Sequence, residues 1–137
     1  MPVFYADASA LVKLVHEEAE SPALRMFLTG ADLVSSELVL TEIPRAARRL
    51  AAREKGLSIN LLLERADELT GALAFRPIDH KLLAWAGSLA EPALRSLDAI
   101  HVASAVSLAS IDGFVTYDER QAAAARLSGL RTVAPGA

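Results

Sequence analysis

Short apolar segments alternate with helical segments along the whole chain, and this alternation limits the fold more than any other feature of the sequence. Five segments have the length and composition of buried strands, at residues 3–6, 32–35, 73–78, 113–116 and 130–133. Helical patterns fill the intervals between them, at 8–18, 21–30, 36–56, 58–71, 80–89, 97–109 and 119–127. The alternation predicts βαβ units, and therefore an α/β fold whose parallel sheet is covered on both faces.

The chain has 137 residues, and we expect one domain that spans residues 1–137 without a repeat or a linker. It contains no cysteine, so thiol catalysis, disulfides and thiolate metal sites are excluded. No apolar run reaches the length of a membrane span and no signal-peptide pattern is present, so we expect a cytoplasmic protein with no membrane partner. The hydrophobic fraction of 53% is high for a small domain and predicts an apolar interface with a protein partner.

Two acidic residues follow predicted strands. Asp7 comes directly after the strand at 3–6, and Asp118 comes shortly after the strand at 113–116. Open parallel sheets bind ligands beyond the carboxyl ends of their strands, so both carboxylates could converge there on one hard cation. Each also has a structural alternative, because Asp is a preferred N-cap and a predicted helix follows both residues. Ser9 could act as a cap too, or could support a carboxylate or a metal-bound water.

Two further acids lie on predicted helices. Asp98 shares a helical face with Val102 and Ala105, where a carboxylate is costly unless it is paired or bound to a cation. Its alternative is a structural place in the first turn, where the helix dipole favours an acid. Glu42 could instead form an exposed ion pair with Arg45 at i+3. Together with the acids at the strand ends, these residues favour one shared site.

Four motifs contain these acids: DASALVK at 7–13, TE at 41–42, LDAIHVA at 97–103 and TYD at 116–118. In these motifs, and over nearly its whole length, the chain resembles the PIN-domain nucleases, and among them the VapC toxins of bacterial toxin-antitoxin pairs. The resemblance implies a three-layer α/β/α sandwich with a five-stranded parallel sheet in the order 3-2-1-4-5. The chain departs from the family at Pro44, because proline removes a backbone donor and can kink a helix. This departure bears directly on where Glu42 lies.

The resemblance also implies a metal-dependent endoribonuclease toxin, which hydrolyses RNA in line and leaves a 5′-phosphate and a 3′-hydroxyl. The family's catalytic acids carry over onto Asp7, Glu42, Asp98 and Asp118, and its supporting hydroxyls onto Ser9 and Thr116. Oxygen ligands without a His or Cys cluster suit Mg²⁺ or Mn²⁺, held by Asp7, Asp98 and Asp118 as one ion or two. Glu42 would ligate the metal or orient the attacking water. The implied partners are a second copy of the chain and a VapB-like antitoxin that lies on the helices between Leu11 and Leu63.

Three arginines recur every four residues on one predicted helix and form a single stripe: Arg45, Arg49 and Arg53. This stripe could contact the phosphates of an RNA substrate, or it could be a solvated helix face. The net charge of −3 leaves room for such a local basic patch. The three histidines show no catalytic spacing and receive no chemical role, with a structural hydrogen bond expected for His101.

Two other functions compete with a nuclease. A phosphatase with Asp7 as its covalent nucleophile would need a second acid two residues later, where this chain has Ser9. A PIN-like module that binds RNA or protein without cutting is the alternative function. A set of four acids argues against such a module, because gathering like charges is costly without a function.

Overall fold

The computed structural model describes residues 1–137 and contains a single five-stranded sheet in the order β3-β2-β1-β4-β5. Its strands are β1 (Val3–Ala6), β2 (Asp32–Ser36), β3 (Ala74–Arg76), β4 (Gly113–Val115) and β5 (Thr132–Val133). Every neighbouring pair is parallel. The predicted α/β class, the parallel pairing and the strand order are therefore confirmed.

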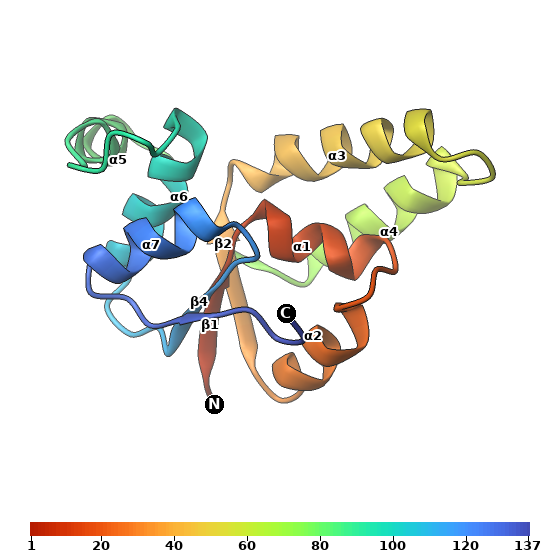
Figure 1. The fold of residues 1–137 in the computed structure, drawn as a ribbon, viewed down its shortest axis with the longest axis horizontal. Helices are drawn as coiled ribbons and strands as arrows, with labels where there is room; N and C mark the ends of the chain where they lie inside the picture. The colour runs from red at the N-terminus through yellow and green to blue at the C-terminus, as the bar shows by residue number, and fades with distance from the viewer.

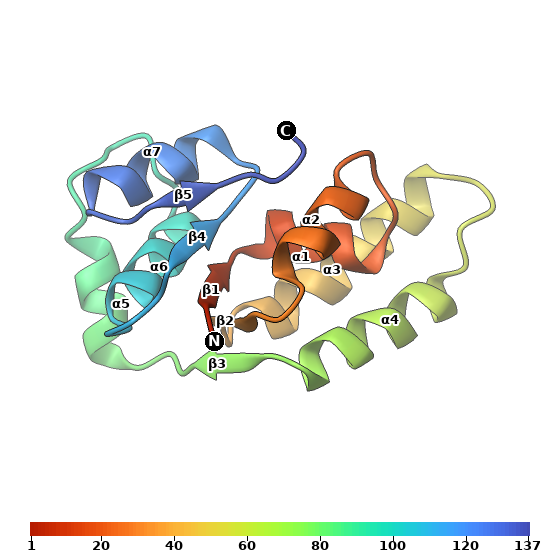
Figure 2. The same cartoon turned by 90° about the horizontal axis from the view of Figure 1, so that it is seen from below.

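Seven helices cover the two faces of this sheet. One face carries α1 (Ala8–Val15), α2 (Ser21–Leu28), α3 (Val39–Arg53) and α4 (Ile59–Gly71), and the other carries α5 (His80–Gly87), α6 (Ser96–Val106) and α7 (Glu119–Leu127). Figures 1 and 2 show the sheet between these two groups of helices, as the predicted α/β/α sandwich requires. None of the helices combines the length and the apolar composition needed to cross a membrane.

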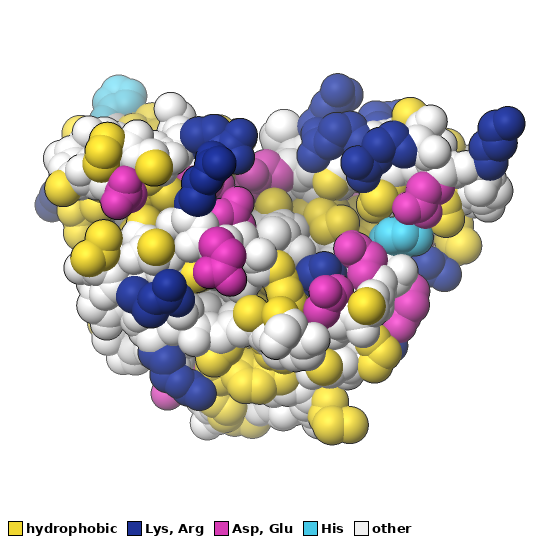
Figure 3. Space-filling view, viewed as in Figure 1, with side chains coloured by type: hydrophobic (Ala, Val, Ile, Leu, Met, Phe, Trp, Pro, Cys, Tyr) yellow, Lys and Arg dark blue, Asp and Glu magenta, His cyan; other side chains and the backbone are white.

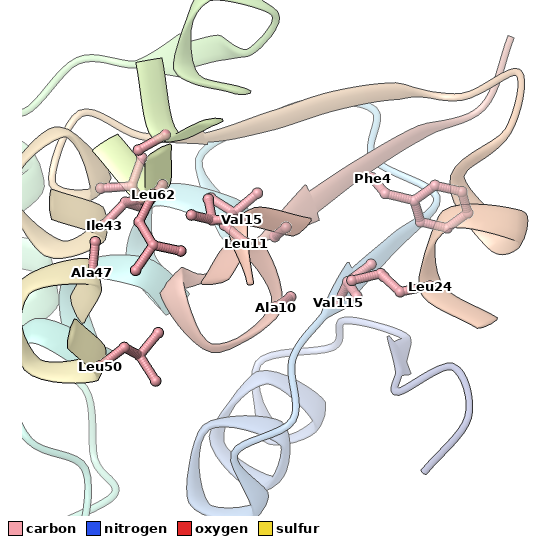
Figure 4. Close-up of a cluster of buried hydrophobic side chains, with 13 residues drawn as sticks. Phe4, Ala10, Leu11, Val15, Leu24, Ile43, Ala47, Leu50, Leu62 and Val115 are labelled. Atoms are coloured by element: carbon pink, nitrogen blue, oxygen red, sulfur yellow. The ribbon is translucent and has the colours of Figure 1, made fainter. Parts of the chain in front are cut away.

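Strand β1 lies in the middle of the sheet and contributes to the cores on both of its faces. Phe4 and Ala6 pack into the larger core with buried side chains of α1 to α4, several of which are labelled in Figure 4. Tyr5 points to the opposite face and packs with Phe114 and Val102 in a second core. This alternation along a strand places an apolar residue on each face and leads the chain directly to Asp7.

Several predicted helices begin or end at other residues in the structure; α6, for example, ends at Val106 instead of residue 109. The first helix ends at Val15 instead of residue 18. The third helix begins at Val39 instead of residue 36, because Ser36 is the last residue of β2 and its hydroxyl accepts a hydrogen bond from the Leu38 N–H at 3.1 Å. Apolar periodicity defines which face of a helix is buried but does not define where the helix ends.

Candidate active site

The elements of the fold bring the predicted acids to the carboxyl edge of the sheet. Asp7 follows β1 directly, and Asp118 follows β4 and precedes α7. These two strands are neighbours in the sheet and pair in parallel, so they end side by side. Asp98 lies in the first turn of α6 and Glu42 in the first turn of α3.

The carboxylate of Asp7 is buried, with 3% of the residue exposed, and four donors surround it. Its Oδ1 accepts from the Ser9 hydroxyl at 2.7 Å and from the Ala10 N–H at 3.1 Å. Its Oδ2 accepts from the Thr116 hydroxyl at 2.6 Å and from the Gln121 Nε2 at 2.8 Å. The predicted N-cap is confirmed through Ala10, while the other three donors exceed what a cap needs and fix the carboxylate in one orientation.

The two predicted supporting hydroxyls also hold the backbone that leads to Asp118. The Ser9 Oγ accepts from the Tyr117 N–H at 3.0 Å, and the Thr116 Oγ1 accepts from the Asp118 N–H at 3.1 Å. Each hydroxyl thus donates to Asp7 and accepts from the segment after β4. Together they couple the ends of β1 and β4 into one hydrogen-bonded unit.

Asp118 is the N-cap of α7, so its predicted structural role is confirmed. Its Oδ1 accepts from the backbone N–H groups of Arg120 and Gln121 at 2.9 and 3.1 Å. Its Oδ2 makes no hydrogen bond to the protein, and that oxygen is the one free to act on a ligand. Asp118 combines a structural and a candidate functional role, as Asp7 does.

Asp98 is only partly exposed and has little electrostatic compensation. Burial is the main cause that raises the pKa of Asp98, and the negative charge of Asp118 adds to it, followed by that of Asp7. The positive charge of Arg95 opposes this rise, but its Nε lies 4.0 Å from Asp98 Oδ2 and its side chain is 74% exposed. The acids from β1, β4 and α6 therefore lie close enough for their charges to repel one another.

Glu42 lies on the other wall of the site, and its predicted ion pair with Arg45 does not form. Its Oε1 instead lies 2.6 Å from the Nε2 of His101 on α6. Helix α3 continues through Pro44 as one element, so the proline does not separate Glu42 from the rest of the helix. The hydrogen bond to His101 links α3 to α6, the helix that carries Asp98.

A groove of about 560 Å³ lies beside these acids, between α1, α3 and the start of α6. Ser9 and Glu42 line it together with Arg45, Arg49 and Arg53, so the predicted arginine stripe forms one wall of this groove. All three arginines are exposed, and no acidic side chain lies within ion-pair distance of them. In Figure 3, Lys and Arg side chains gather over α3 on one side of a hollow, and acidic side chains lie within it.

Comparison with known proteins shows the family of this chain. The family model described as PIN domain matches residues 4–127. The chain belongs to the PIN-domain family. It is 39% identical to ribonuclease VapC35 and 36% identical to ribonuclease VapC47, both of Mycobacterium tuberculosis, over 98% of this chain and 98% of each relative. Ribonuclease VapC46 of the same organism is also 39% identical, over 98% of this chain and 99% of that protein. The resemblance to VapC-type PIN domains is therefore confirmed.

The fold of this PIN domain is also found among solved structures. One of these is VapBC2 from Rickettsia felis bound to a DNA fragment from their promoter, with a TM-score of 0.67. The aligned region covers 97% of this chain and 98% of that one at 13% sequence identity. At such low identity the match shows the PIN fold, with the same sandwich of helices around a parallel sheet.

The donor set of this PIN domain fits a hard divalent cation by its chemistry. The side chains of Asp7, Asp98 and Asp118 offer oxygen only, and their mutual repulsion is the electrostatic condition that a cation relieves. No three Asp, Glu or His side chains of the chain are already arranged as a metal-binding group. The side chains of Asp98 and Asp118 are freer to turn toward an ion than that of Asp7, because they make fewer hydrogen bonds.

Sequence reasoning missed Gln121, and it expected a structural hydrogen bond for His101 without identifying Tyr5 or Glu42 as its partners. Gln121 is 1% exposed, its amide donates to Asp7, and its Oε1 has no hydrogen-bond partner. It stands three residues after Asp118, and this D-x-x-Q spacing is a capping-box signal that could have drawn attention to it. No sequence signal joins Tyr5 to His101, because 96 residues separate them.

Proposed function

We propose that this PIN domain is a metal-dependent endoribonuclease that acts as the toxin of a toxin-antitoxin pair. One observation carries the proposal: three mutually repelling carboxylates stand at one edge of the sheet, beside a groove with three unpaired arginines in its wall. Acids of this kind suit a cation, and an arginine-lined groove suits a polyanion. RNA is the polyanion that agrees with the ribonuclease names of the relatives.

Mg²⁺ or Mn²⁺ is the cation that these residues would hold, with Asp7, Asp98 and Asp118 as its ligands. Carboxylate oxygens without sulfur or a histidine cluster select such ions over zinc. Bound there, the ion would supply Lewis-acid activation of water and neutralise charge on the phosphodiester. Ser9 and Thr116 hold the Asp7 carboxylate in a fixed orientation, and the ion would take the place of one of the four donors around its two oxygens.

Glu42 is the group that would orient the attacking water and receive its proton. Its carboxylate lines the groove and is hydrogen-bonded to His101, which lies three residues after Asp98 on α6. A carboxylate in hydrogen-bond reach of a water is suited to general-base catalysis. Attack on the phosphorus from this side, in line with the departing 3′-oxygen, would leave a 5′-phosphate and a 3′-hydroxyl.

The arginine stripe would hold the phosphates of the RNA. If it does, replacing Arg45, Arg49 and Arg53 by alanine should weaken RNA binding and flatten its dependence on salt concentration, because fewer counterions are released. The matched control is Arg131→Ala, which removes an exposed arginine that precedes β5 and lies far along the chain from the groove. An unchanged salt slope in the triple variant would show that the stripe is a solvated face.

The partners of this toxin would be a second copy of the chain and a VapB-like antitoxin. A homodimer is supported by apolar side chains that stay exposed on α5, where Leu83 is 42% and Trp85 38% exposed. An antitoxin segment on the helices between Leu11 and Leu63 is supported by exposed Leu40 and Leu61. A monomer at micromolar concentration in sedimentation, and the lack of an antitoxin gene beside this one, would count against these partners.

The decisive experiment measures cleavage of a panel of structured and single-stranded RNAs with and without Mg²⁺ or Mn²⁺. Wild type, Asp7→Asn and Asp98→Asn are compared with Asp67→Asn, which changes an exposed acid on α4. We expect metal-dependent cutting by wild type and Asp67→Asn only. Metal-dependent cutting that survives both site substitutions would refute the site, and RNA binding without any cutting would favour the alternative of a non-catalytic PIN-like module.

A further inference from the structure

His101 is a buried histidine that uses both ring nitrogens and lies directly behind Glu42. The residue is 1% exposed, its Nε2 lies 2.6 Å from Glu42 Oε1, and its Nδ1 lies 2.7 Å from the Tyr5 hydroxyl. We propose that His101 is a positioning residue, which Tyr5 holds in place and which sets the orientation of the Glu42 carboxylate for catalysis. This inference rests on the proposed ribonuclease function.

The protons of this chain of hydrogen bonds have a definite arrangement. An ionised carboxylate can only accept a hydrogen bond, so the proton between His101 and Glu42 belongs to Nε2. In the neutral ring Nδ1 is then the acceptor, and the Tyr5 hydroxyl is its donor. A tyrosine hydroxyl is protonated at neutral pH, so it is available to donate. Tyr5 thereby selects the tautomer that serves Glu42.

The packing around the two rings leaves them little freedom. Tyr5 is 0% exposed and its ring stacks on Phe114, with centroids 5.1 Å apart and an interplanar angle of 22°. The ring of His101 meets Tyr5 edge-on, at 5.9 Å and 73°. Tyr5 and Phe114 belong to the paired strands β1 and β4, so His101 packs against the sheet through Tyr5.

Glu42 depends on this support because nothing else holds its carboxylate. The bond to His101 is the one hydrogen bond or ion pair that its side chain makes, and 19% of that side chain is exposed to the groove. The other proposed catalytic acids reach the site from β1, the segment after β4, and α6, whereas Glu42 comes from α3. The His101 hydrogen bond therefore joins α3, which carries Glu42, to α6, which carries Asp98.

Two substitutions of His101 by amide residues distinguish its hydrogen bond to Glu42 from its hydrogen bond to Tyr5. His101→Gln places an amide nitrogen near the position of Nε2 and can still donate to Glu42, whereas His101→Asn reaches only the region of Nδ1 and Tyr5. We expect His101→Asn to lower kcat by roughly 10- to 100-fold with little change in KM, and His101→Gln to recover most of that loss. Tyr5→Phe, which keeps the stacked ring, should give a smaller loss of kcat.

The measurements use the RNA that wild type cuts fastest, at saturating Mg²⁺, with the thermal midpoint of each variant recorded in parallel. Equal losses in His101→Asn and His101→Gln, or losses that follow the folded fraction alone, would overturn the inference. In the Glu42→Gln background, His101→Asn should cause no further loss of kcat, because its effect passes through Glu42. A full additional loss in the double variant would also overturn it.

A measurement on the wild-type protein makes the test independent of whether the variants fold. An NMR spectrum that correlates the ring nitrogens of His101 with their protons should show a protonated Nε2, and an unprotonated Nε2 would overturn the inference. The failure of the proposed function looks different, since wild type would then cut no RNA or Glu42→Gln would cut as fast as wild type. A His101→Asn variant at the wild-type rate beside an inactive Glu42→Gln would reject the role of His101 alone.

Discussion

The two sides of the acidic site differ sharply in how their carboxylates are held. Asp7 is buried and accepts four hydrogen bonds, from Ser9, Ala10, Thr116 and Gln121. The nearest cation to Asp98 is Arg95, at 4.0 Å, and only one carboxylate oxygen of Asp118 accepts hydrogen bonds. The Asp7 carboxylate is fully hydrogen-bonded without any ligand, whereas the carboxylates of Asp98 and Asp118 repel each other.

The difference separates the two tasks that an acidic site must perform. The Asp7 side supplies a fixed reference point, because hydrogen bonds from α1, α7 and the end of β4 converge on one side chain. The Asp98 and Asp118 side stores unfavourable electrostatic energy that a bound cation can release. If this account is correct, substitutions on the two sides should have opposite effects on the stability of the fold.

Asp7→Asn should have the largest effect. The amide would point a donor at groups that are themselves donors, so we expect a loss of about 2 to 3 kcal/mol in the free energy of unfolding. Cleavage of RNA should fall by about 100-fold or more, since a proposed metal ligand is lost. Urea denaturation and cleavage assays measure the two quantities, with Asp67→Asn as the control. If Asp7→Asn were as stable as wild type, the hydrogen bonds to Asp7 would not stabilise the fold, and the two sides of the site would not differ in this respect.

Thr116→Val should have the next largest effect, because valine keeps the shape and loses the hydroxyl. The hydroxyl that donates to Asp7 also accepts from the Asp118 N–H, and we expect a loss of about 1 to 2 kcal/mol. The matched control is Thr132→Val, whose hydroxyl accepts from an exposed Arg126. Chemical denaturation should separate the two variants clearly, and equal stabilities would mean that the hydrogen bonds to Asp7 contribute little.

Addition of Mg²⁺ should stabilise the protein through the second side of the site. A ligand at ten times its Kd raises the free energy of unfolding by about 1.4 kcal/mol, which is visible as a shift in Tm. Differential scanning calorimetry at matched ionic strength should show this shift for wild type and not for Asp98→Asn. An equal shift in both proteins would place the cation elsewhere.

Asp98→Asn should have the smallest effect, and its sign should be opposite to that of Asp7→Asn. Burial and the charge of Asp118 raise the pKa of Asp98 in the folded state, so the folded protein binds this proton more tightly than the unfolded chain. The ionised form therefore destabilises the fold, and without metal the Asn variant should gain roughly 1 °C in Tm at neutral pH. The gain in Tm should vanish below the ordinary pKa of Asp. It should grow as the pH rises from that value through the raised pKa of the folded state. A loss of stability at neutral pH would contradict this sign.

The fold was predictable from sequence because it depends on local patterns. Apolar strands followed by helices predict parallel βαβ units, and acids such as Asp7 and Asp118 can be recognised where a strand ends and a cap is needed. The partner of Glu42 could not be predicted in this way. Arg45 is its neighbour on the helix, yet Glu42 bonds to His101, which lies 59 residues away. Such pairs depend on tertiary packing, which no local pattern contains.

The central position of β1 also has a consequence for the folding of this protein. Phe4 and Ala6 belong to one core, Tyr5 belongs to the other, and Asp7 is the next residue in the chain. Loss of either core would displace the strand, so a partly unfolded molecule cannot keep Asp7 in register with the end of β4. Activity should thus disappear in the same cooperative transition as the tertiary structure, and incompletely folded chains would be harmless to the RNA around them.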